Sequence, residues 1–321
     1  MLGHAMKLRQ LAYFVKVVEV GNITRAAEQL NLAQTALGIQ IRNLEDSLQI
    51  QLLDRHSRGV SATPAGMLLY ERAIEILQRI EETKRDLIAL GGEKVRIRFG
   101  ATPSTLKLIG TELLVEANAR LPNIALEVVE ELSFMLTDAL DRGDLDYVLA
   151  YDIEDNPGIR RIALLEEDLL HVSAPTGEAQ SGDISFRQAV EGDLALVSNR
   201  DIIWKRVQET ASRLSVDVKI TYQVQSNEAI KALVLHGVAQ SIMPYGIVAE
   251  EVRKGQIIAR RIARPAIKRT LFLAHPSHRS FSDEKPFLAF IDRMVDRLTK
   301  EIGPYAHTID RLMAAEQADF V

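Results

Sequence analysis

The chain has 321 residues, enough for two or three domains with separate cores; 47% are hydrophobic and 26% are charged. It has no cysteine, which excludes disulfides, thiolate metal sites and a cysteine nucleophile. The sequence has no run of about 18 apolar residues, so we expect no membrane-spanning helix and no membrane partner. The absence of a signal sequence indicates a cytoplasmic protein.

The formal net charge of −5 is distributed unevenly. Residues 1–60 contain seven basic and five acidic side chains, so the acidic excess lies in the rest of the chain. A mildly basic head on an acidic body is typical of a nucleic-acid-binding module joined to a different domain.

The first 50 residues predict three helices. Apolar residues spaced three and four apart predict a first helix that ends at Gly21, and Asn22 or Thr24 can cap a short second helix. A turn at Asn31 and Leu32 leads to a third helix at about 33–48. The third helix has an apolar stripe formed by Leu37, Ile41, Leu44 and Leu48. Two helices joined by a tight turn form a helix-turn-helix, whose second helix enters the DNA major groove.

A small hairpin follows, with extended segments predicted at 52–55 and 60–63, and we interpret it as a wing. Thr63 and Pro64 then form a strong helix start, and this helix continues to Leu90 before Gly91 and Gly92. Its apolar residues alternate spacings of four and three, which predicts a coiled-coil contact between subunits. The dimerisation residues expected on this seam are Leu69, Ala73, Ile76, Ile80 and Leu87. The alternative is a helix that packs on its own domain.

Beyond Gly92, strands alternate with helices, a pattern typical of βαβ units on mostly parallel sheets. Strands are predicted at 95–100, 124–130, 146–151, 169–173, 194–198, 219–224, 239–243 and 270–274. Helices are predicted at 103–120, 134–142, 202–214, 228–236, 246–254 and 286–301. About 220 residues of this kind favour two lobes with a cleft between them.

Over nearly its full length the chain resembles a LysR-type transcriptional regulator. The opening MKLRQLAYFVKVVEVGNITRAAEQLNLAQTALGIQIRNLEDSLQIQLLDR follows the family's N-terminal signature. SATPAG (Ser61–Gly66), GDLDYVLAY (Gly143–Tyr151) and HGVAQSIMP (His236–Pro244) match later signatures in the right order. The family's start falls at Met6, so either Met1 or Met6 is the first residue.

The resemblance implies a multidomain fold: an N-terminal, mainly α winged helix-turn-helix, a long linker helix and a C-terminal α/β effector domain of two Rossmann-like lobes, similar to periplasmic binding proteins. We expect a DNA-binding domain at 1–63, a linker and hinge at 64–92, an effector-binding domain at 93–303 and a tail at 304–321. Lobe I is expected at about 93–166 and 269–303, and lobe II at about 167–268. The expected partners are double-stranded DNA, further copies of the chain as a dimer or tetramer, and RNA polymerase.

The third helix supplies the expected base contacts. The amide of Gln34 suits adenine edges, Thr35 can offer a methyl group to thymine, and Arg42 can reach guanine or phosphate. Further contacts are expected from Arg25, Gly38, Ile39, Arg55 and Arg58, with the wing arginines on phosphate or in the minor groove. The alternative for each arginine is a solvated surface charge.

The recognition helix departs from the family pattern Ser-Gln-Pro-Ala-Leu-Ser, because this chain has Ala33-Gln34-Thr35-Ala36-Leu37-Gly38. Two hydroxyl groups that hydrogen-bond phosphate or bases are therefore missing. We expect an altered base preference with the same mode of binding.

The segment Thr102, Pro103, Ser104 and Thr105 lies where a strand ends and a helix begins, a place that favours an anion. The family binds small, often anionic metabolites here, between its lobes. Ser198, Asn199 and Ser226, with Gln225, follow other strand ends and are expected to complete the site. The alternative is that Thr102 or Ser104 only caps the helix.

No catalytic motif or metal-ligand spacing is present among the seven histidines, so we expect neither an enzyme nor a cofactor or metal. Three other functions were weighed: a solute-binding protein, an enzyme with a regulatory DNA-binding domain, and a regulator whose C-terminal domain serves only in assembly. The effector, the operator, the direction of regulation and the role of the tail stay open.

Overall fold

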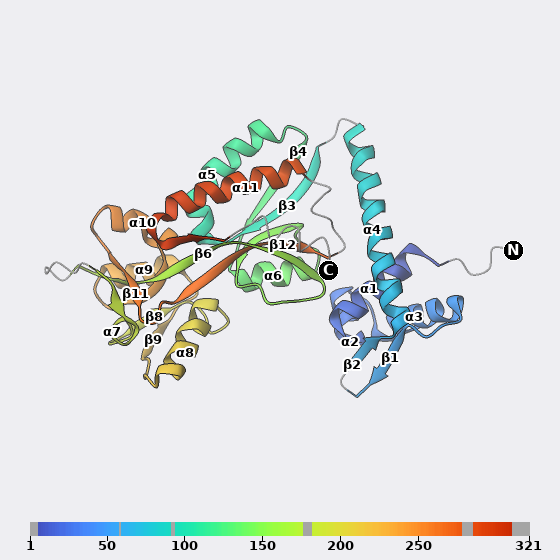
Figure 1. Ribbon diagram of the computed structural model, residues 1–321, viewed down its shortest axis with the longest axis horizontal. Coiled ribbons are helices and arrows are strands. Elements are labelled where there is room, and N and C mark those ends of the chain that lie inside the picture. The colour runs from blue at the N-terminus through green and yellow to red at the C-terminus, as the bar shows by residue number, and fades with distance from the viewer. Residues whose placement is uncertain (1–5, 58, 91–93, 176–181, 278–284, 310–321) are drawn as a thin grey trace.

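The computed structural model describes residues 6–57, 59–90, 94–175, 182–277 and 285–309. The chain forms a small helical head, one long helix and a larger α/β body (Figure 1). No helix in these ranges is long and apolar enough to cross a membrane.

The head is a winged helix-turn-helix. It contains α1 (Leu8–Val20), α2 (Ile23–Gln29) and α3 (Gln34–Leu48), followed by the hairpin of β1 (Leu53–His56) and β2 (Gly59–Ala62). Gly21 ends α1 in the left-handed conformation, and its carbonyl accepts a hydrogen bond from the backbone N–H of Val60 at 2.9 Å. A Cβ on Gly59 would lie 2.3 Å from the Gly21 carbonyl oxygen, so only glycine allows the wing to approach α1 this closely.

Helix α4 (Pro64–Leu90) has the predicted bounds and stands between the head and the body (Figure 1). Its first turns belong to the head: Ala73 and Ile74 are buried in one cluster with Leu11 and Val15 of α1. Ala73 is fully buried within the single chain, so the expected subunit contact at this residue is wrong. Helix α1 covers the N-terminal part of the apolar seam of α4. The seam is exposed closer to the C-terminal end of α4.

The body begins with lobe I, whose strands and helices are β3 (Val95–Ala101), α5 (Pro103–Arg120), β4 (Ile124–Glu130), α6 (Ser133–Asp141) and β5 (Tyr147–Tyr151). Strand β3 pairs in parallel with both β4 and β5. Helix α11 (Lys285–Ile302) returns to this lobe and packs beside α5 (Figure 1). Phe99, Ile109, Tyr147 and Phe287 are among the residues of the shared core.

Two long strands, β6 (Ile159–Ser173) and β12 (Lys268–Pro276), cross between the lobes and pair with each other in antiparallel fashion. Lobe II contains β7 (Ile184–Ser185), α7 (Phe186–Ala189), β8 (Leu194–Leu196), α8 (Ile202–Leu214), β9 (Ile220–Gln223), α9 (Asn227–Leu235), β10 (Ser241–Pro244), α10 (Tyr245–Arg253) and β11 (Ile258–Ala263). The 3₁₀ turn η2 (Gly303–Tyr305) leads into β13 (Ala306–Thr308), which adds to β6.

The sheets are therefore mixed rather than mostly parallel, which corrects the expectation from sequence. Strand β6 pairs in antiparallel fashion with β10, β11, β12 and β13. The first part of β6, and all of β7, β11 and β13, were not predicted. Alternating strands and helices suggested only parallel crossovers, whereas β5 leads into β6, and β11 leads into β12, without a helix in between.

Candidate nucleic-acid interface and sensor cleft

Helix α3 turns one face into the head and leaves the opposite face open. Leu37, Ile41 and Leu44 are fully buried against α1 and α2, whereas Leu48, expected to be buried in the same stripe, is 40% exposed. The predicted base-contacting side chains Gln34, Thr35, Ile39 and Arg42 are all exposed, with Ile39 at 53%. Gly38 is half-buried, and a Cβ there would have no atom within 4 Å. The outer face is thus free for a groove of DNA.

The remaining predicted DNA contacts lie on α2 and on the wing. Arg25 lies exposed in the first turn of α2, where its backbone N–H donates to Asn22 Oδ1 at 3.1 Å. Arg55 is exposed on β1. Arg58 lies outside the described residues. Arg25 and Arg55 therefore add exposed basic groups to the head, which also exposes the polar face of α3.

The predicted dimerisation seam on α4 divides into two parts. Leu69 and Ala73 face α1 and the core of the head. Ile76 is 38% exposed, Ile80 is half-buried, and Leu87 is 63% exposed. Leu68 is also exposed. Apolar side chains on the free part of an isolated helix are the type that a second helix covers.

In the body, the hydroxyl groups predicted to meet an effector turn inward. Thr102 Oγ1 lies 3.3 Å from Ser104 Oγ and 3.0 Å from Thr105 Oγ1, and all three residues are buried. Arg269 Nη2 donates to Ser104 Oγ at 2.9 Å. These hydroxyls therefore belong to an internal network, and the side chain of Thr102 does not cap α5.

Arg269 lies at the centre of this network. Its guanidinium forms a buried ion pair with Glu167, with Nη2 and Oε2 2.7 Å apart, and stacks on the Tyr151 ring at 3.4 Å from the ring centroid. Burial opposes the charged form of Arg269, but the carboxylate of Glu167 raises its pKa. Burial also raises the pKa of Tyr151 far above its ordinary value. A buried guanidinium requires such partners, which explains why the hydroxyls face it.

Two cavities lie between the lobes. One, of about 630 Å³, lies between α5, α6 and α9 and is lined by Pro103, Lys107, Glu131, Leu132 and Ser226 among others. The other, of about 420 Å³, lies between the loop after β5 and α8 and is lined by Ser133, Phe134, Asp152, Arg200 and Lys205 among others. Each cavity has walls from both lobes.

Of the predicted effector residues, Pro103 and Ser226 reach the larger cavity, and Ser226 also caps α9 by accepting from the Ala229 N–H at 3.2 Å. Thr102, Ser104 and Thr105 lie behind it, in the Arg269 network. Ser198 accepts from the Arg200 N–H at 3.2 Å, and neither Ser198 nor Asn199 lines these two cavities.

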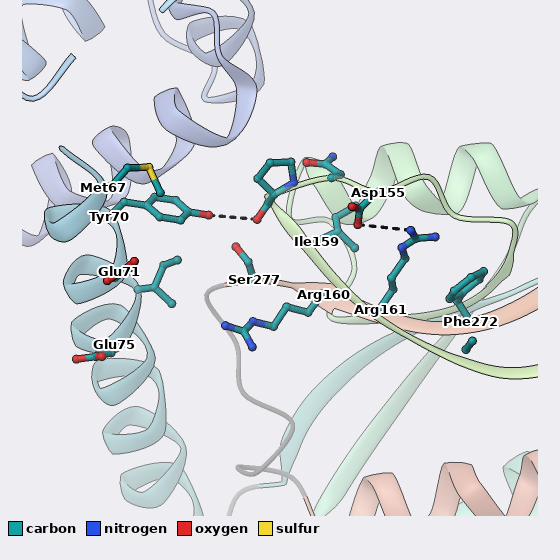
Figure 2. Close-up of a pocket in the computed structure, with 14 residues that line it drawn as sticks. Met67, Tyr70, Glu71, Glu75, Asp155, Ile159, Arg160, Arg161, Phe272 and Ser277 are labelled. Carbon is teal, nitrogen blue, oxygen red and sulfur yellow. Dashed lines mark hydrogen bonds and ion pairs between the residues drawn. The ribbon is translucent and has the colours of Figure 1, made fainter. Parts of the chain in front are cut away.

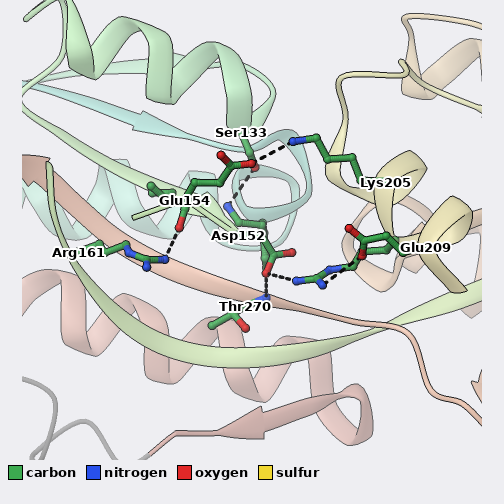
Figure 3. Close-up of polar contacts among 10 residues, drawn as sticks. Ser133, Asp152, Glu154, Arg161, Lys205, Glu209 and Thr270 are labelled. Carbon is green, nitrogen blue, oxygen red and sulfur yellow. Dashed lines mark hydrogen bonds and ion pairs between the residues drawn. The ribbon is translucent and has the colours of Figure 1, made fainter. Parts of the chain in front are cut away.

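The sequence reading missed the charged groups that join the lobes. Arg200 pairs with Asp138 at 3.1 Å. Lys205 pairs with Glu154 at 3.1 Å, and Arg206 pairs with Asp152 at 3.2 Å (Figure 3). Across the larger cavity, Lys107 pairs with Glu228 at 3.0 Å. The cluster of Arg200, Lys205 and Arg206 near the start of α8 could have indicated a charged contact, although the sequence does not identify the partners.

Asp152 holds three parts of the body together. It has a left-handed φ of 48°, and its Oδ1 accepts from the Thr270 N–H at 3.1 Å as well as from Arg206 (Figure 3). A non-glycine residue in this conformation is held there by its surroundings. The end of β5, the crossing strand β12 and helix α8 of lobe II thus meet at one carboxylate.

These features define a winged-helix DNA-binding protein that carries a two-lobed ligand-binding-type domain. The model of the lysR family of bacterial regulatory helix-turn-helix proteins matches residues 8–67, and the model of the LysR substrate binding domain matches residues 90–299. The chain belongs to the LysR family of transcriptional regulators.

Similar proteins and structures agree with this assignment. The chain is similar to the nitrogen assimilation regulatory protein nac of Escherichia coli (strain K12), with 30% identity over 87% of this chain and 92% of the relative. Its fold resembles an OxyR mutant of Corynebacterium glutamicum, with a TM-score of 0.58, 22% identity and 92% of this chain and 94% of that chain covered. It also resembles full-length CbnR complexed with its target DNA, with a TM-score of 0.54, 21% identity and 90% and 100% coverage. This chain is a DNA-binding transcriptional regulator.

Proposed function

We propose that the protein binds its operator as a homo-oligomer, with α3 in the major groove and the wing on the neighbouring backbone. The observation that carries this proposal is the exposed face of α3, where Gln34, Thr35, Ile39 and Arg42 have no contact with the core while the opposite face is fully buried. Arg25, Gly38, Arg55 and Arg58 complete the proposed DNA surface. The family models on 8–67 and 90–299 support a division into a DNA-binding domain at 1–63, a linker at 64–92, an effector domain at 93–303 and a tail.

Selection of binding sequences from a random DNA pool by the purified full-length chain tests this function. We expect enrichment of a site with two related halves, because two heads on one dimer contact two half-sites about one helical turn apart. A pool without an enriched sequence would contradict it. On promoter DNA we propose that the bound protein meets RNA polymerase, and that it works in the cytoplasm, where its DNA lies.

We propose further that the body senses a small metabolite that carries a carboxylate or similar anion and binds between the lobes. Support comes from Arg200 and Lys205, which line the smaller cavity and each already hold a carboxylate of the facing lobe. An effector anion would replace Asp138 or Glu154 at these cations. Pro103 and Ser226 line the second cavity and are proposed to contact an effector there.

One observation favours a second candidate, a regulator that needs no effector. Arg269 is already satisfied by Glu167 and Ser104, and four ion pairs between side chains of the protein itself join the lobes. A thermal-shift screen with carboxylate metabolites, with and without operator DNA, separates the two candidates. Stabilisation by one metabolite supports sensing, whereas stabilisation by DNA alone supports the second candidate.

A further inference from the structure

The DNA-binding head is held against lobe I of its own chain by polar contacts on α1 and α4. Lys16 Nζ donates to the carbonyl oxygen of Asp141 at 2.6 Å, and Ser277 Oγ donates to Glu19 Oε1 at 2.8 Å. Tyr70 of α4 donates its hydroxyl proton to the Pro157 carbonyl at 3.1 Å (Figure 2). We name these three hydrogen bonds the docking contact.

The docking contact includes two charged side chains, Glu19 and Lys16, that are largely buried. The side chain of Glu19 is only 7% exposed and lies 3.8 Å from Lys16. Lys16 meets the last residue of α6, where a helix leaves carbonyl groups without partners and its dipole favours a cation. A Cβ on Gly158 would lie 3.2 Å from the Glu19 carboxyl group, so the lobe leaves just enough room for this side chain.

The receiving surface of lobe I is itself held together. Asn156 Oδ1 accepts from the Gly158 N–H at 2.9 Å, and Asn156 Nδ2 donates to Asp141 Oδ1 at 3.3 Å. The Ser277 N–H donates to the Gly158 carbonyl at 2.9 Å. Hydrogen bonds therefore join the end of α6, the turn at 156–158 and the residue after β12 into one surface.

The docking contact is flanked by two open spaces and is not a packed core. A cavity of about 930 Å³ separates α4 from lobe I, and Arg160 extends into it from β6 (Figure 2). A second cavity, of about 310 Å³, lies between α1 and the end of α6. The apolar clusters of the head and of lobe I do not merge in the described residues, so we expect the polar bonds to decide whether the head is docked.

The same short part of lobe I also carries the ion pairs to lobe II. Asp138, which pairs with Arg200, lies one turn before Asp141 on α6. Asp152 and Glu154, which pair with Arg206 and Lys205, precede Pro157 on the connecting loop (Figure 3). These pairs are largely exposed on the lobe II side, and exposed pairs break at low cost.

We propose that residues 133–158 transmit a change in the arrangement of the lobes directly to the DNA-binding head of the same subunit, through the docking contact. The coupling does not pass through the hinge at the end of α4. It rests on the proposed function only in that the position of the head governs DNA binding. Neighbouring residues at the end of α6, and successive parts of the loop after β5, contact lobe II and the head respectively, so a shift at one contact displaces the other.

The experiment measures the head position without DNA or effector. Because the chain has no cysteine, Thr24→Cys on α2 and Thr111→Cys on α5, both exposed, place one spin label on the head and one on lobe I. Pulsed EPR then gives the distance between them, with labelled chains diluted in unlabelled ones to suppress signals between subunits. We compare this background with Gly158→Val, with Lys16→Met and with the charge reversal Arg200→Glu plus Lys205→Glu.

We expect a narrow distance distribution in the background, a broader one in Gly158→Val and in Lys16→Met, and a shift on charge reversal that disappears when Gly158→Val is already present. Distributions that are the same with and without Gly158→Val and Lys16→Met would show that the head is not docked. A charge reversal without effect would show that docking is not coupled to the lobes. Circular dichroism confirms that each variant is folded, and failure of DNA selection would be a separate result.

Discussion

The guanidinium of Arg269 donates a hydrogen bond over 2.9 Å to the hydroxyl of Ser104, a residue 165 positions earlier in the chain. This bond joins the first turn of α5 to the crossing strand β12. Ser104 thus supplies a hydrogen-bond acceptor to the buried guanidinium of Arg269.

Replacing Ser104 by Ala should destabilise the protein. The variant leaves a donor of the buried Arg269 without its acceptor, which costs about 1–3 kcal/mol of the free energy of unfolding. Urea denaturation measures this quantity. Thr111→Ala on the exposed side of α5 is the matched control, and equal stability of the two variants would contradict the role assigned to Ser104.

If Arg42 contacts a base, Arg42→Ala should weaken binding to the selected operator by about 1–3 kcal/mol. If Arg42 contacts phosphate, the slope of log affinity against log salt concentration should fall in magnitude by about 1. A mobility-shift titration at several salt concentrations distinguishes the two. Arg96→Ala, at an exposed arginine of lobe I, is the control and should bind normally. Normal binding by Arg42→Ala would remove this residue from the proposed DNA surface.

The two parts of the α4 seam should respond differently to substitution. Leu87→Asp should lower the oligomer mass measured by light scattering, because Leu87 is exposed within one chain. Leu48→Asp, at an exposed leucine of the head, should leave the mass unchanged. Ala73→Leu should instead cost about 1–3 kcal/mol of stability by overpacking against α1. An unchanged mass in Leu87→Asp would place the dimer contact elsewhere.

Stability should fall as the solution becomes more acidic, in part because of His171. Burial lowers the pKa of His171 below its ordinary value of 6.5. The hydrogen bond between His171 Nε2 and Gln240 Oε1, 2.5 Å apart, opposes this shift but does not cancel it. The unfolded chain then binds more protons than the folded one, so stability is lost as pH falls through 6.5 towards the lowered pKa. The variant His171→Gln should show a smaller loss between pH 7.5 and 5.5, as measured by urea unfolding (pH values chosen about one unit on either side of the unfolded pKa). The same change at exposed His236 is the control, and a parallel pH profile in His171→Gln would exclude His171 as a source.

The sequence by itself determined most of the local structure. Periodicity and caps predicted α4, α5 and α8 with the bounds that the structure has, because these signals lie within a few residues of each other. The outward face of α3 followed from the same periodicity. The family motifs then supplied the order of head, linker and lobes.

Tertiary structure decided the partners. The pairing of Arg269 with Glu167 depends on the antiparallel register of β6 and β12, which no local pattern encodes. The same is true of Ala73, which meets α1 instead of a second subunit, and of Lys16, whose acceptor lies 125 residues away. A hydroxyl at a strand end has the same sequence context whether it faces a ligand or a buried guanidinium. In the folded chain, Arg269 is buried away from water and needs hydrogen-bond acceptors. The hydroxyl of Ser104 therefore faces the guanidinium and not a ligand.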